Sequence, residues 1–458
     1  MSLKLRLIIM NFLQFYVWGS WLITLGNYWF GTKGWGPTDF GAVFLTLGIA
    51  SMFMPTLTGI IADKWMNAEK LYGLLHILGG ITVFCFPMVQ SPEAFFWVML
   101  LAMTFYMPTI ALANTVGYNA LKNDGFDVIK DFPPIRVWGT IGFIAAMWVT
   151  NLTGNKSTEM MFYFSSIAAV ILGIYSFTLP KCPPQAKVDE KKSFLQILGL
   201  DAFKLFANYK MALFFIFSML LGASLQLTNM YGDVFLDEFK FFDSFADSFV
   251  VKYSTIIMSI SQISETLFIL TIPFFLKRFG IKKVMLLSML AWVLRFALFG
   301  FGDPVGGLWM IILSMVVYGM AFDFFNISGS LFVETQCPPS MRASGQGLFM
   351  MMTNGLGTII GALGSGFIID KFYTLKFDRI KGLTEHFGGS QDSKNIHHFL
   401  EEKGIAIQNS GALDRVAEVR DWPNIWLLFA IFAFFIAVLF AILFKHKHNP
   451  KEIENFQH

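Results

Sequence analysis

Charged residues are scarce in this chain of 458 amino acids, since only 14% are Asp, Glu, Lys or Arg while 55% are apolar. An ordinary soluble protein carries about 25% charged residues. The mean hydropathy of +0.58 is well above the values of water-soluble chains. This shortage of charge excludes a soluble protein of ordinary composition and indicates that lipid is the main solvent of the chain.

Cysteine is also scarce. Cys85 lies in an apolar run, and Cys182 and Cys337 stand beside prolines, so neither a disulfide framework nor a zinc site is expected. No cofactor is expected either. The net charge of +3 includes no basic block large enough for nucleic acid. Lys4 and Arg6 precede a long apolar stretch without a small-residue cleavage site, which predicts a retained first helix rather than a signal peptide.

What the chain does have is a series of long apolar runs. A helix that crosses a bilayer needs about 20 mostly apolar residues, and internal glycine or proline does not exclude one. Twelve runs meet this description, at 7–30, 39–62, 71–91, 94–118, 135–152, 160–180, 211–236, 249–276, 283–302, 307–333, 343–369 and 424–444. The sequence therefore predicts an all-α integral membrane protein with twelve transmembrane helices.

Lys and Arg residues are distributed unequally between the two sets of connecting loops. One set, together with both termini, carries most of them: Lys4, Arg6, Lys64, Lys70, Lys122, Lys130, a cluster from Lys181 to Lys210, Lys277, Arg278, Lys282, Lys283, Arg342, Lys445 and Lys447. The opposite short loops carry only Lys33, Lys156 and Lys240. Because positive charge is retained on the cytoplasmic side, both termini are expected there. Two termini on the same side require an even number of spans, and twelve satisfies this.

A polar segment at 181–210 divides the spans into six and six. It ends in SFLQILGLDAFKLF, which predicts a solvated linker finishing in a surface helix. The expected organisation is an N-terminal six-helix half at 1–180, the cytoplasmic linker at 181–210 and a C-terminal six-helix half at 211–458. A long loop of mixed charge is expected at about 371–423.

The two halves also carry related loops. GIIADKW follows the second span and LKRFGIKK follows the eighth. Together they resemble the G-x-x-x-D-R/K-x-G-x-K/R loop of the major facilitator superfamily, split between two copies. The matching residues are Gly59, Asp63, Lys64, Arg278, Gly280 and Lys282. The resemblance implies the major facilitator fold, with a substrate site near the bilayer midplane between the halves and alternating access to it.

Polar residues inside the spans are few, and they are costly there unless they face a bundle interior or a cavity. They recur at spacings of three or four residues, which place them on one helix face. The sets are Arg136 and Thr140 with Phe143; Gln226 and Asn229; Gln262 and Glu265; and Tyr318, Phe322, Asp323 and Asn326. They fall on spans 5, 7, 8 and 10, which line the cavity in the superfamily layout.

Each set also has a purely structural interpretation. Amide pairs join helices through hydrogen bonds, Glu265 could form a buried ion pair with Arg136, and Asp323 could be a helix-packing acid. His76 and Arg295 lie on spans expected to be peripheral: His76 is interpreted as a packed histidine, and Arg295 as snorkelling to the outer surface. Trp18 and Trp21 are interpreted as packing or interfacial residues.

Amides, carboxylates, aromatic rings and a single arginine suit a neutral, flat, hydroxyl-bearing solute. Amide and carboxylate groups bind hydroxyls, and Phe143 and Phe322 offer faces on which a base could stack. A phosphorylated substrate would favour two or more arginines. Glu265 or Asp323 could bind a proton on one side and release it on the other, which would couple transport to a proton gradient.

Five strings have a more specific resemblance: FLQFYVWGSWLITLG, DFPPIRVWGTIGFI, FFIFSMLLGASLQLTN, SISQISETLFILTIPFFL and YGMAFDFFNISGS. They are similar to those of the bacterial nucleoside:proton symporters. The resemblance implies substrate contacts by Arg136, Thr140, Phe143, Gln226, Asn229, Gln262, Glu265, Tyr318, Phe322 and Asp323. It further implies that Glu265 and Asp323 take part in proton coupling.

The loop at 371–423 departs from that pattern by its length. It contains His397, His398, Glu401 and Glu402, whose spacing would allow a metal site, but a solvated surface helix is the preferred interpretation. No metal is expected.

The expected function is proton-coupled import of purine and pyrimidine nucleosides by a monomer in the bacterial inner membrane. A proton-independent facilitator and a symporter of another neutral sugar-like solute remain alternatives. A membrane enzyme would need a nucleophile and base or a metal cluster, and none stands out, so the chain is not expected to be an enzyme. A receptor without transport is a further alternative that a flux assay separates from a carrier.

Overall fold

The computed structural model describes residues 1–184, 200–241, 245–338, 341–376 and 418–446. The first helix group comprises α1 (Leu3–Gly19), the π-helix η1 (Asn27–Lys33), α2 (Pro37–Lys64), α3 (Ala68–Phe84), η2 (Phe86–Met88), α4 (Pro92–Asn123), α5 (Val128–Leu152) and α6 (Met160–Ser176). The second group contains η3 (Leu200–Ala207), α8 (Tyr209–Glu238), η4 (Phe239–Phe241), α9 (Phe249–Lys252), α10 (Ser254–Ile269), α11 (Ile272–Phe301), α12 (Leu308–Gln336), α13 (Arg342–Met350), η6 (Met351–Gly357), α14 (Thr358–Phe372) and α18 (Trp422–Leu443).

Several helices begin at a proline in the first turn or at a side chain that caps the helix N-terminus. Pro37 and Pro92 occupy the first turns of α2 and α4, where a missing amide hydrogen costs nothing. Ser91 accepts a hydrogen bond from the amide of Ala94, and Asn208 accepts from the amides at the start of α8. Such caps satisfy backbone donors that have no partner within the helix.

Nine of the described helices are long and apolar enough to cross a membrane. Two further apolar helices, α6 and α10, are shorter, and α1 ends at Gly19, before a turn that interrupts the first predicted span. The helical architecture predicted from sequence is therefore confirmed. A membrane crossing by these three segments, and hence the full count of twelve, stays a prediction.

The predicted loop between spans eight and nine appears as a break inside α11. Gly280 has φ of 75° and ψ of 167°, a left-handed conformation that glycine adopts without steric cost. This glycine belongs to the superfamily-like loop, and Lys282 beside it donates a hydrogen bond to the carbonyl oxygen of Ala441 at 2.9 Å. The break separates residues 272–279, which follow α10 after a two-residue turn, from the longer helical part at 281–301.

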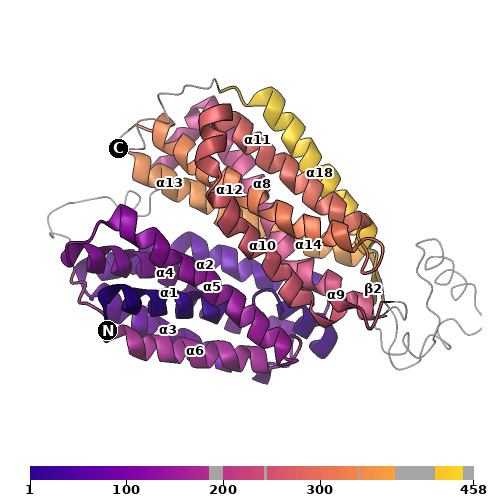
Figure 1. Ribbon diagram of the computed structural model, residues 1–458, viewed down its shortest axis with the longest axis horizontal. Helices are drawn as coiled ribbons and strands as arrows, with labels where there is room; N and C mark the ends of the chain where they lie inside the picture. The colour runs from indigo at the N-terminus through magenta and orange to yellow at the C-terminus, as the bar shows by residue number, and fades with distance from the viewer. Residues whose placement is uncertain (185–199, 242–244, 339–340, 377–417, 447–458) are drawn as a thin grey trace, which may run out of the picture.

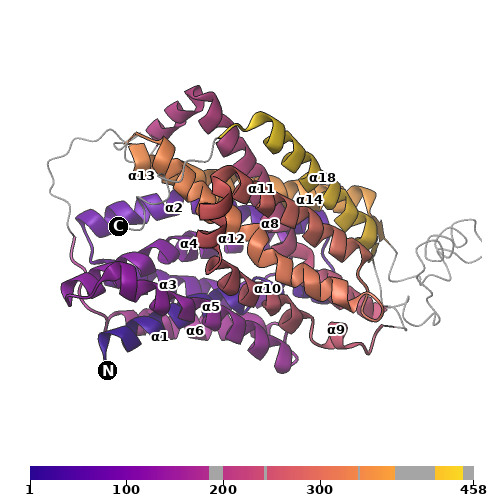
Figure 2. The ribbon, with the colours of Figure 1, turned by 45° about the horizontal axis from the view of Figure 1, so that its top comes forward.

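The helices pack as two groups that lie side by side. Figures 1 and 2 show α1–α6, indigo to magenta, beside α8–α18, pink to yellow. Within the first group α1 packs on α5 and α3 on α6, and within the second α11 packs on α12 and α18. The largest helix contacts between the groups join α2 to α14 and α5 to α10.

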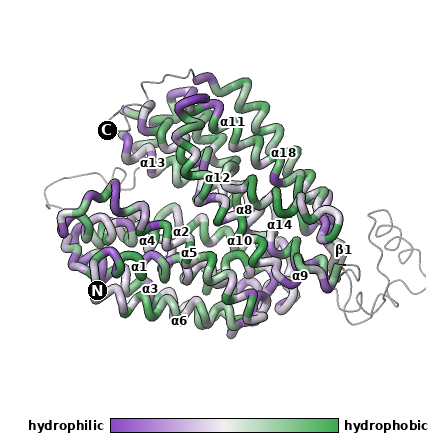
Figure 3. Tube along the Cα trace, in the orientation of Figure 1, coloured by the Kyte–Doolittle hydropathy of each residue, from purple (hydrophilic) through white to green (hydrophobic). Residues whose placement is uncertain are grey.

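The bundle has two polar ends, and Figure 3 shows hydrophobic residues along the helices between them. We call the end with Leu3, the start of α13 and the end of α18 the terminal end (Figure 1). The other, the strand end, carries an antiparallel ladder of β1 (Thr374–Lys376) and β2 (Glu418–Arg420). This ladder is the one departure from the all-α expectation among the described residues.

Two predicted features fall partly or wholly outside the described residues. Of the predicted surface helix at the end of the linker, the described part is the 3₁₀ helix η3, which packs on α8 and α13. The four His and Glu residues of the long loop, His397, His398, Glu401 and Glu402, lie outside the described residues.

Candidate functional site

A cavity of about 370 Å³ lies between the two helix groups. Its volume is within the range of small-molecule sites, about 300–1,000 Å³. The lining residues come from α1, α2, α4 and α5 of the first group and from α8, α10, α12, η6 and α14 of the second, together with the turn that follows α1. These are the spans that the superfamily layout assigns to a cavity, and no lining residue comes from α3, α6, α11 or α18.

Nine of the ten residues predicted to bind substrate line this cavity. They are Arg136, Thr140, Phe143, Gln226, Asn229, Gln262, Glu265, Tyr318 and Phe322. They stand on four helices, α5, α8, α10 and α12, and are far apart in the sequence. Packing therefore brings the predicted polar sets together.

Asp323 is the tenth predicted residue, and it does not line the cavity. Its side chain is 4% exposed and follows Phe322 on α12, so a helical turn of about 100° per residue rotates it behind the wall. Its Oδ2 has no hydrogen-bond partner among the described residues. Its charge nevertheless interacts with that of Glu265, which does line the cavity.

In the first group, Arg136 and Phe143 on α5 face Phe15 and Trp18 on α1. The guanidinium carbon of Arg136 lies 4.0 Å from the centroid of the Phe15 ring. The rings of Trp18 and Phe143 meet edge to face, with centroids 6.4 Å apart. α1 can approach α5 closely because a Cβ at Gly142 would lie 2.1 Å from the backbone oxygen of Phe12.

The second group supplies the amides and two parallel rings. Gln226 Nε2 and Gln262 Oε1 are buried without a hydrogen-bond partner among the described residues. The rings of Tyr318 and Phe322 are stacked on α12, with centroids 6.2 Å apart and planes 6° apart. Since buried polar atoms are nearly always paired, a donor and an acceptor left unpaired in one cavity wall indicate a ligand with both functions.

The sequence left open a buried ion pair between Arg136 and Glu265. Both side chains line the cavity and their charges interact, yet no ion pair within 4.0 Å joins them in the part of the chain that the structure describes. Arg136 is instead held by the Phe15 ring. Both groups can therefore interact with a solute in the cavity.

Of three sequence interpretations, two change in the structure and one is confirmed. Trp18 lines the cavity, and its indole nitrogen is buried without an acceptor among the described residues, so it is more than a packing residue. Arg295 does not snorkel, because its side chain is 0% exposed. His76 is packed as expected: its Nε2 lies 2.8 Å from Oε1 of Gln14, which also accepts from the Tyr72 hydroxyl.

Sequence reasoning missed Asn354 and Thr358 on the wall of the cavity. They stand four residues apart, a spacing that places both on one helix face, and Asn354 lies in the π-helix η6. That spacing was the available signal in the eleventh span. Ser51 on α2, also missed, has no polar neighbour at helical spacing to draw attention to it.

The strand end of the cavity is closed by polar contacts between the groups. Asn27 Nδ2 donates to Asp233 Oδ2 at 2.6 Å, and Lys156 pairs with Asp237 at 2.6 Å. Thr38 on α2 donates to Asp370 Oδ2 at 2.6 Å. All the hydrogen bonds and ion pairs that join the two groups within the described ranges lie toward this end.

No group of three or more His, Cys, Asp or Glu side chains that could hold a metal is found among the described residues. The cavity instead offers amides, hydroxyls, rings, one guanidinium and one carboxylate. This set is suited to binding rather than to covalent chemistry.

The sequence profile of the family described as "Nucleoside H+ symporter" matches residues 1–386 of the chain. The chain belongs to this family. It is therefore a membrane transporter and not an enzyme, as predicted, and the resemblance found in the five sequence strings is confirmed.

Two relatives match almost the full length of the chain. The nucleoside permease NupG of Escherichia coli is 49% identical over 449 residues, 98% of this chain and 97% of the permease. The xanthosine permease of E. coli is 46% identical over 459 residues, 99% of each chain. A crystal structure of nucleoside transporter NupG, as a D323A mutant, superposes with a TM-score of 0.85 at 48% identity, covering 97% and 100% of the two chains. The predicted fold class is thus confirmed.

Proposed function

We propose that this transporter carries nucleosides across the membrane together with protons, and that the nucleoside binds in the cavity between the helix groups. The observation that carries the proposal is the pair of unpartnered buried amide atoms, Gln226 Nε2 and Gln262 Oε1, in a cavity also lined by aromatic rings. A nucleoside has donors, acceptors and a flat base. Base stacking on an aromatic side chain contributes about 1–3 kcal/mol per base.

The charge of the cavity favours a neutral solute over a phosphorylated one. Arg136 is the one cationic side chain among the lining residues, and Glu265 is the one acidic side chain. A nucleotide phosphate would be repelled by Glu265 and would lack the second guanidinium that bidentate phosphate binding favours. A neutral sugar and base meet neither obstacle.

Glu265 and Asp323 are the proposed proton-coupling groups. Glu265 lines the cavity, and Asp323 is buried behind Phe322 with one oxygen unpartnered among the described residues. Their charges interact, so protonation of one carboxyl group lowers the cost of a negative charge on the other. A substrate that contacts Glu265 would thereby sense the proton occupancy of Asp323, and such differential binding is what coupling requires.

Transport is proposed to proceed by alternating access, with residues 1–180 and 211–458 moving as two halves joined by the 181–210 linker. The excess of Lys and Arg supports a cytoplasmic terminal end, in a single-chain transporter of the bacterial inner membrane. The strand-end contacts of Asn27, Lys156 and Thr38 would then close the outer side. By this assignment the structure is closed on its outer side.

The deciding experiment is uptake of labelled uridine and adenosine into proteoliposomes, with and without an inward proton gradient. Wild type is compared with Glu265→Gln and Asp323→Asn, and with Asp303→Asn as a control, because Asp303 lies in a turn outside the cavity. Gradient-driven accumulation should be lost in Glu265→Gln and in Asp323→Asn, and retained in Asp303→Asn. A potential of about 100 mV is worth about 2.3 kcal/mol per charge, so cotransport of one proton per nucleoside at that driving force should concentrate nucleoside roughly fiftyfold in wild type.

Two other outcomes decide between the alternatives. Saturable uptake that ignores the gradient in wild type would identify a nucleoside facilitator without proton coupling. Absence of nucleoside flux, with flux of another neutral sugar-like solute, would overturn the substrate and retain the carrier.

A further inference from the structure

Arg295 is a buried cation that the proposed transport mechanism does not use. It stands on α11, outside the cavity lining, and its side chain is 0% exposed. A charged side chain inside a membrane protein is costly, by about 2.5–3.5 kcal/mol on insertion scales. A buried charge of this kind usually has a function, and the residues around Arg295 indicate what that function is.

The guanidinium contacts three helices that carry cavity residues. Nη1 donates to the carbonyl oxygen of Ser314 on α12 at 2.8 Å and to Oγ of Ser261 on α10 at 3.3 Å. Nε donates to Oγ1 of Thr228 on α8 at 3.5 Å. Ser314 returns a bond from its hydroxyl to the Arg295 carbonyl oxygen at 3.0 Å.

Each of these partners is a close sequence neighbour of a cavity residue. Thr228 lies between Gln226 and Asn229, Ser261 precedes Gln262, and Ser314 is one turn before Tyr318. The arginine thus links the helices that carry these groups at a point behind the wall. None of its hydrogen bonds reaches the cavity itself.

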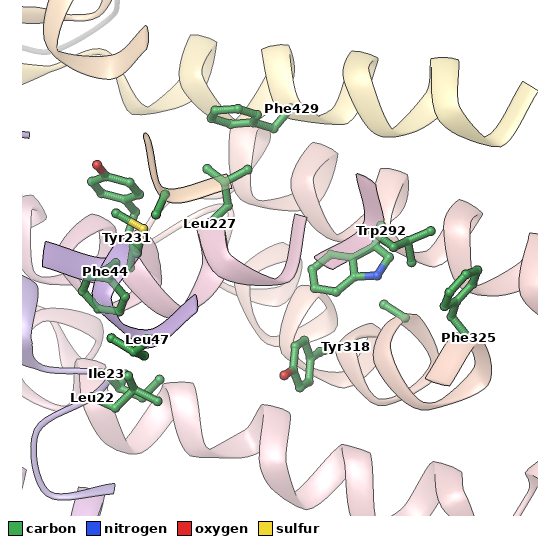
Figure 4. Close-up of a cluster of buried hydrophobic side chains, with 14 of the residues drawn as sticks. Leu22, Ile23, Phe44, Leu47, Leu227, Tyr231, Trp292, Tyr318, Phe325 and Phe429 are labelled. Carbon is green, nitrogen blue, oxygen red and sulfur yellow. The ribbon is translucent and has the colours of Figure 1, made fainter. Parts of the chain in front are cut away.

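The same guanidinium also supports an aromatic wall. Its carbon lies 4.5 Å from the centroid of the Tyr318 ring and 5.1 Å from that of Phe299. Trp292 meets Tyr318 edge to face at 5.9 Å. Figure 4 shows the hydroxyl of Tyr318 turned toward the side of Leu22, Ile23 and Leu47, which line the cavity.

No carboxylate forms an ion pair with Arg295 within the described ranges. Its neighbours are hydroxyls, a carbonyl and two ring faces, of which the Tyr318 face is the nearer, and Nη2 has no hydrogen-bond partner among the described residues. Cation–π attraction increases when water is excluded. The buried guanidinium of Arg295 should therefore hold the Tyr318 ring firmly in one orientation.

We propose that Arg295 is a positioning residue for substrate binding. It holds α8, α10 and α12 in register and fixes the Tyr318 ring, so that the amides of Gln226 and Gln262 and the Tyr318 wall face one solute together. The inference rests on the proposed function, because the solute is taken to be a nucleoside. Arg295 itself does not contact the substrate.

The test measures the Kd for uridine and adenosine with purified full-length protein, and KM and Vmax for uptake in proteoliposomes. The variants are Arg295→Gln and Arg295→Lys. Ser288→Ala is the matched control, because Ser288 is also buried on α11 and its hydroxyl donates to the Ala321 carbonyl of α12 at 2.5 Å. Thermal unfolding of each variant is recorded in parallel.

We expect Arg295→Gln to raise Kd and KM by about thirtyfold, the scale of a desolvated cation–π contact, with Vmax changed much less. Arg295→Lys should recover only part of the affinity. Lysine keeps the positive charge but lacks the planar guanidinium with its forked N–H donors. Ser288→Ala should leave Kd within about twofold of wild type, whatever its effect on stability.

A double-substitution cycle tests whether Arg295 acts through Tyr318. In a Tyr318→Leu background, Arg295→Gln should add much less to Kd than it does in wild type, since contacting residues are not additive. Full additivity overturns the role through Tyr318. An unchanged Kd in Arg295→Gln, with lowered thermal stability, overturns the inference and leaves a structural arginine.

A variant that does not fold can be distinguished from a failure of the proposed function. If Arg295→Gln does not fold, the Kd of Arg295→Lys decides, and a wild-type Kd there overturns the inference. If wild type itself binds neither nucleoside, it is the proposed function that fails, and with it the inference.

Discussion

Arg136 illustrates how much the chemistry of the cavity depends on the geometry of single residues. Its guanidinium lies flat enough on Phe15 for a 4.0 Å approach to the ring centroid, and no ion pair holds it among the described residues. A planar, delocalised cation can stack on a ring with one face and direct its edge at a solute. A lysine ammonium cannot combine the two.

Arg136→Lys should therefore weaken nucleoside binding although the charge is kept. We expect a five- to thirtyfold rise in Kd, since a lost charged hydrogen bond or stacking contact is worth about 1–2 kcal/mol. Isothermal titration with uridine measures it. Arg278→Lys is the matched control, because Arg278 also lies over rings, Phe274 and Phe279, but outside the cavity. Equal effects of the two substitutions would contradict a specific role for Arg136.

At the scale of elements, the crossing of α2 and α14 joins the two helix groups. Gly41 on α2 and Gly366 on α14 meet there: a Cβ on Gly366 would lie 2.7 Å from the Pro37 carbonyl oxygen and 3.1 Å from the Cα of Gly41. Small residues at a helix interface let backbones approach closely in membranes. The strand end closes by backbone contact as well as by ion pairs.

Gly366→Ala should hinder this closure and slow transport. The extra methyl group has no free space, and overpacking costs about 1–3 kcal/mol, so we expect the initial uptake rate to fall at least fivefold at equal membrane abundance. Gly364→Ala, on the same helix, has no heavy atom within 4 Å of the added Cβ and should stay within about twofold of wild type. Matching rates in the two variants would argue against a tight crossing.

At the scale of the whole molecule, the polar contacts between the groups gather at one end. Lys156 of the first group pairs with Asp237 of the second at 2.6 Å, and Lys240 pairs with the same carboxylate at 2.5 Å from within the second group. The first pair must break when the groups separate at the strand end, whereas the second can remain. The two lysines therefore differ in what they contribute to the conformational equilibrium.

Lys156→Gln should shift the equilibrium away from the strand-end-closed state. A hydrogen bond to a charged group is worth about 1.5–3 kcal/mol, so we expect a roughly ten- to hundredfold change. The measurement is labelling of a Ser51→Cys cavity reporter by an impermeant maleimide applied from the strand-end side, with the same chain lacking the reporter as background. Lys240→Gln is the matched control and should leave labelling near its starting level. Parallel increases in both variants would show that general charge, not the inter-group pair, controls closure.

The sequence by itself determined the class of the protein and most of its helices. Long apolar runs act locally along the chain, so they indicated the helices before any packing was known. The loop glycine, Gly280, came from the resemblance to the superfamily loop. The spacing of Gln226 with Asn229, and of Gln262 with Glu265, showed an interior polar face on each helix. The assignment of these residues to one substrate site came from the family resemblance.

Tertiary structure alone decided which side chains meet and which end is closed. Rotation about α12 places Tyr318 and Phe322 in the cavity wall and Asp323 behind it. The spacing puts Asp323 on another face than Phe322, but it does not tell which of the two faces meets the cavity. Trp18 enters the cavity, and Arg295 lies behind it on a helix expected to be peripheral. Asn27 and Asp233 are 206 residues apart. Such contacts depend on how whole helices cross, and hydropathy along the chain carries no information about that crossing.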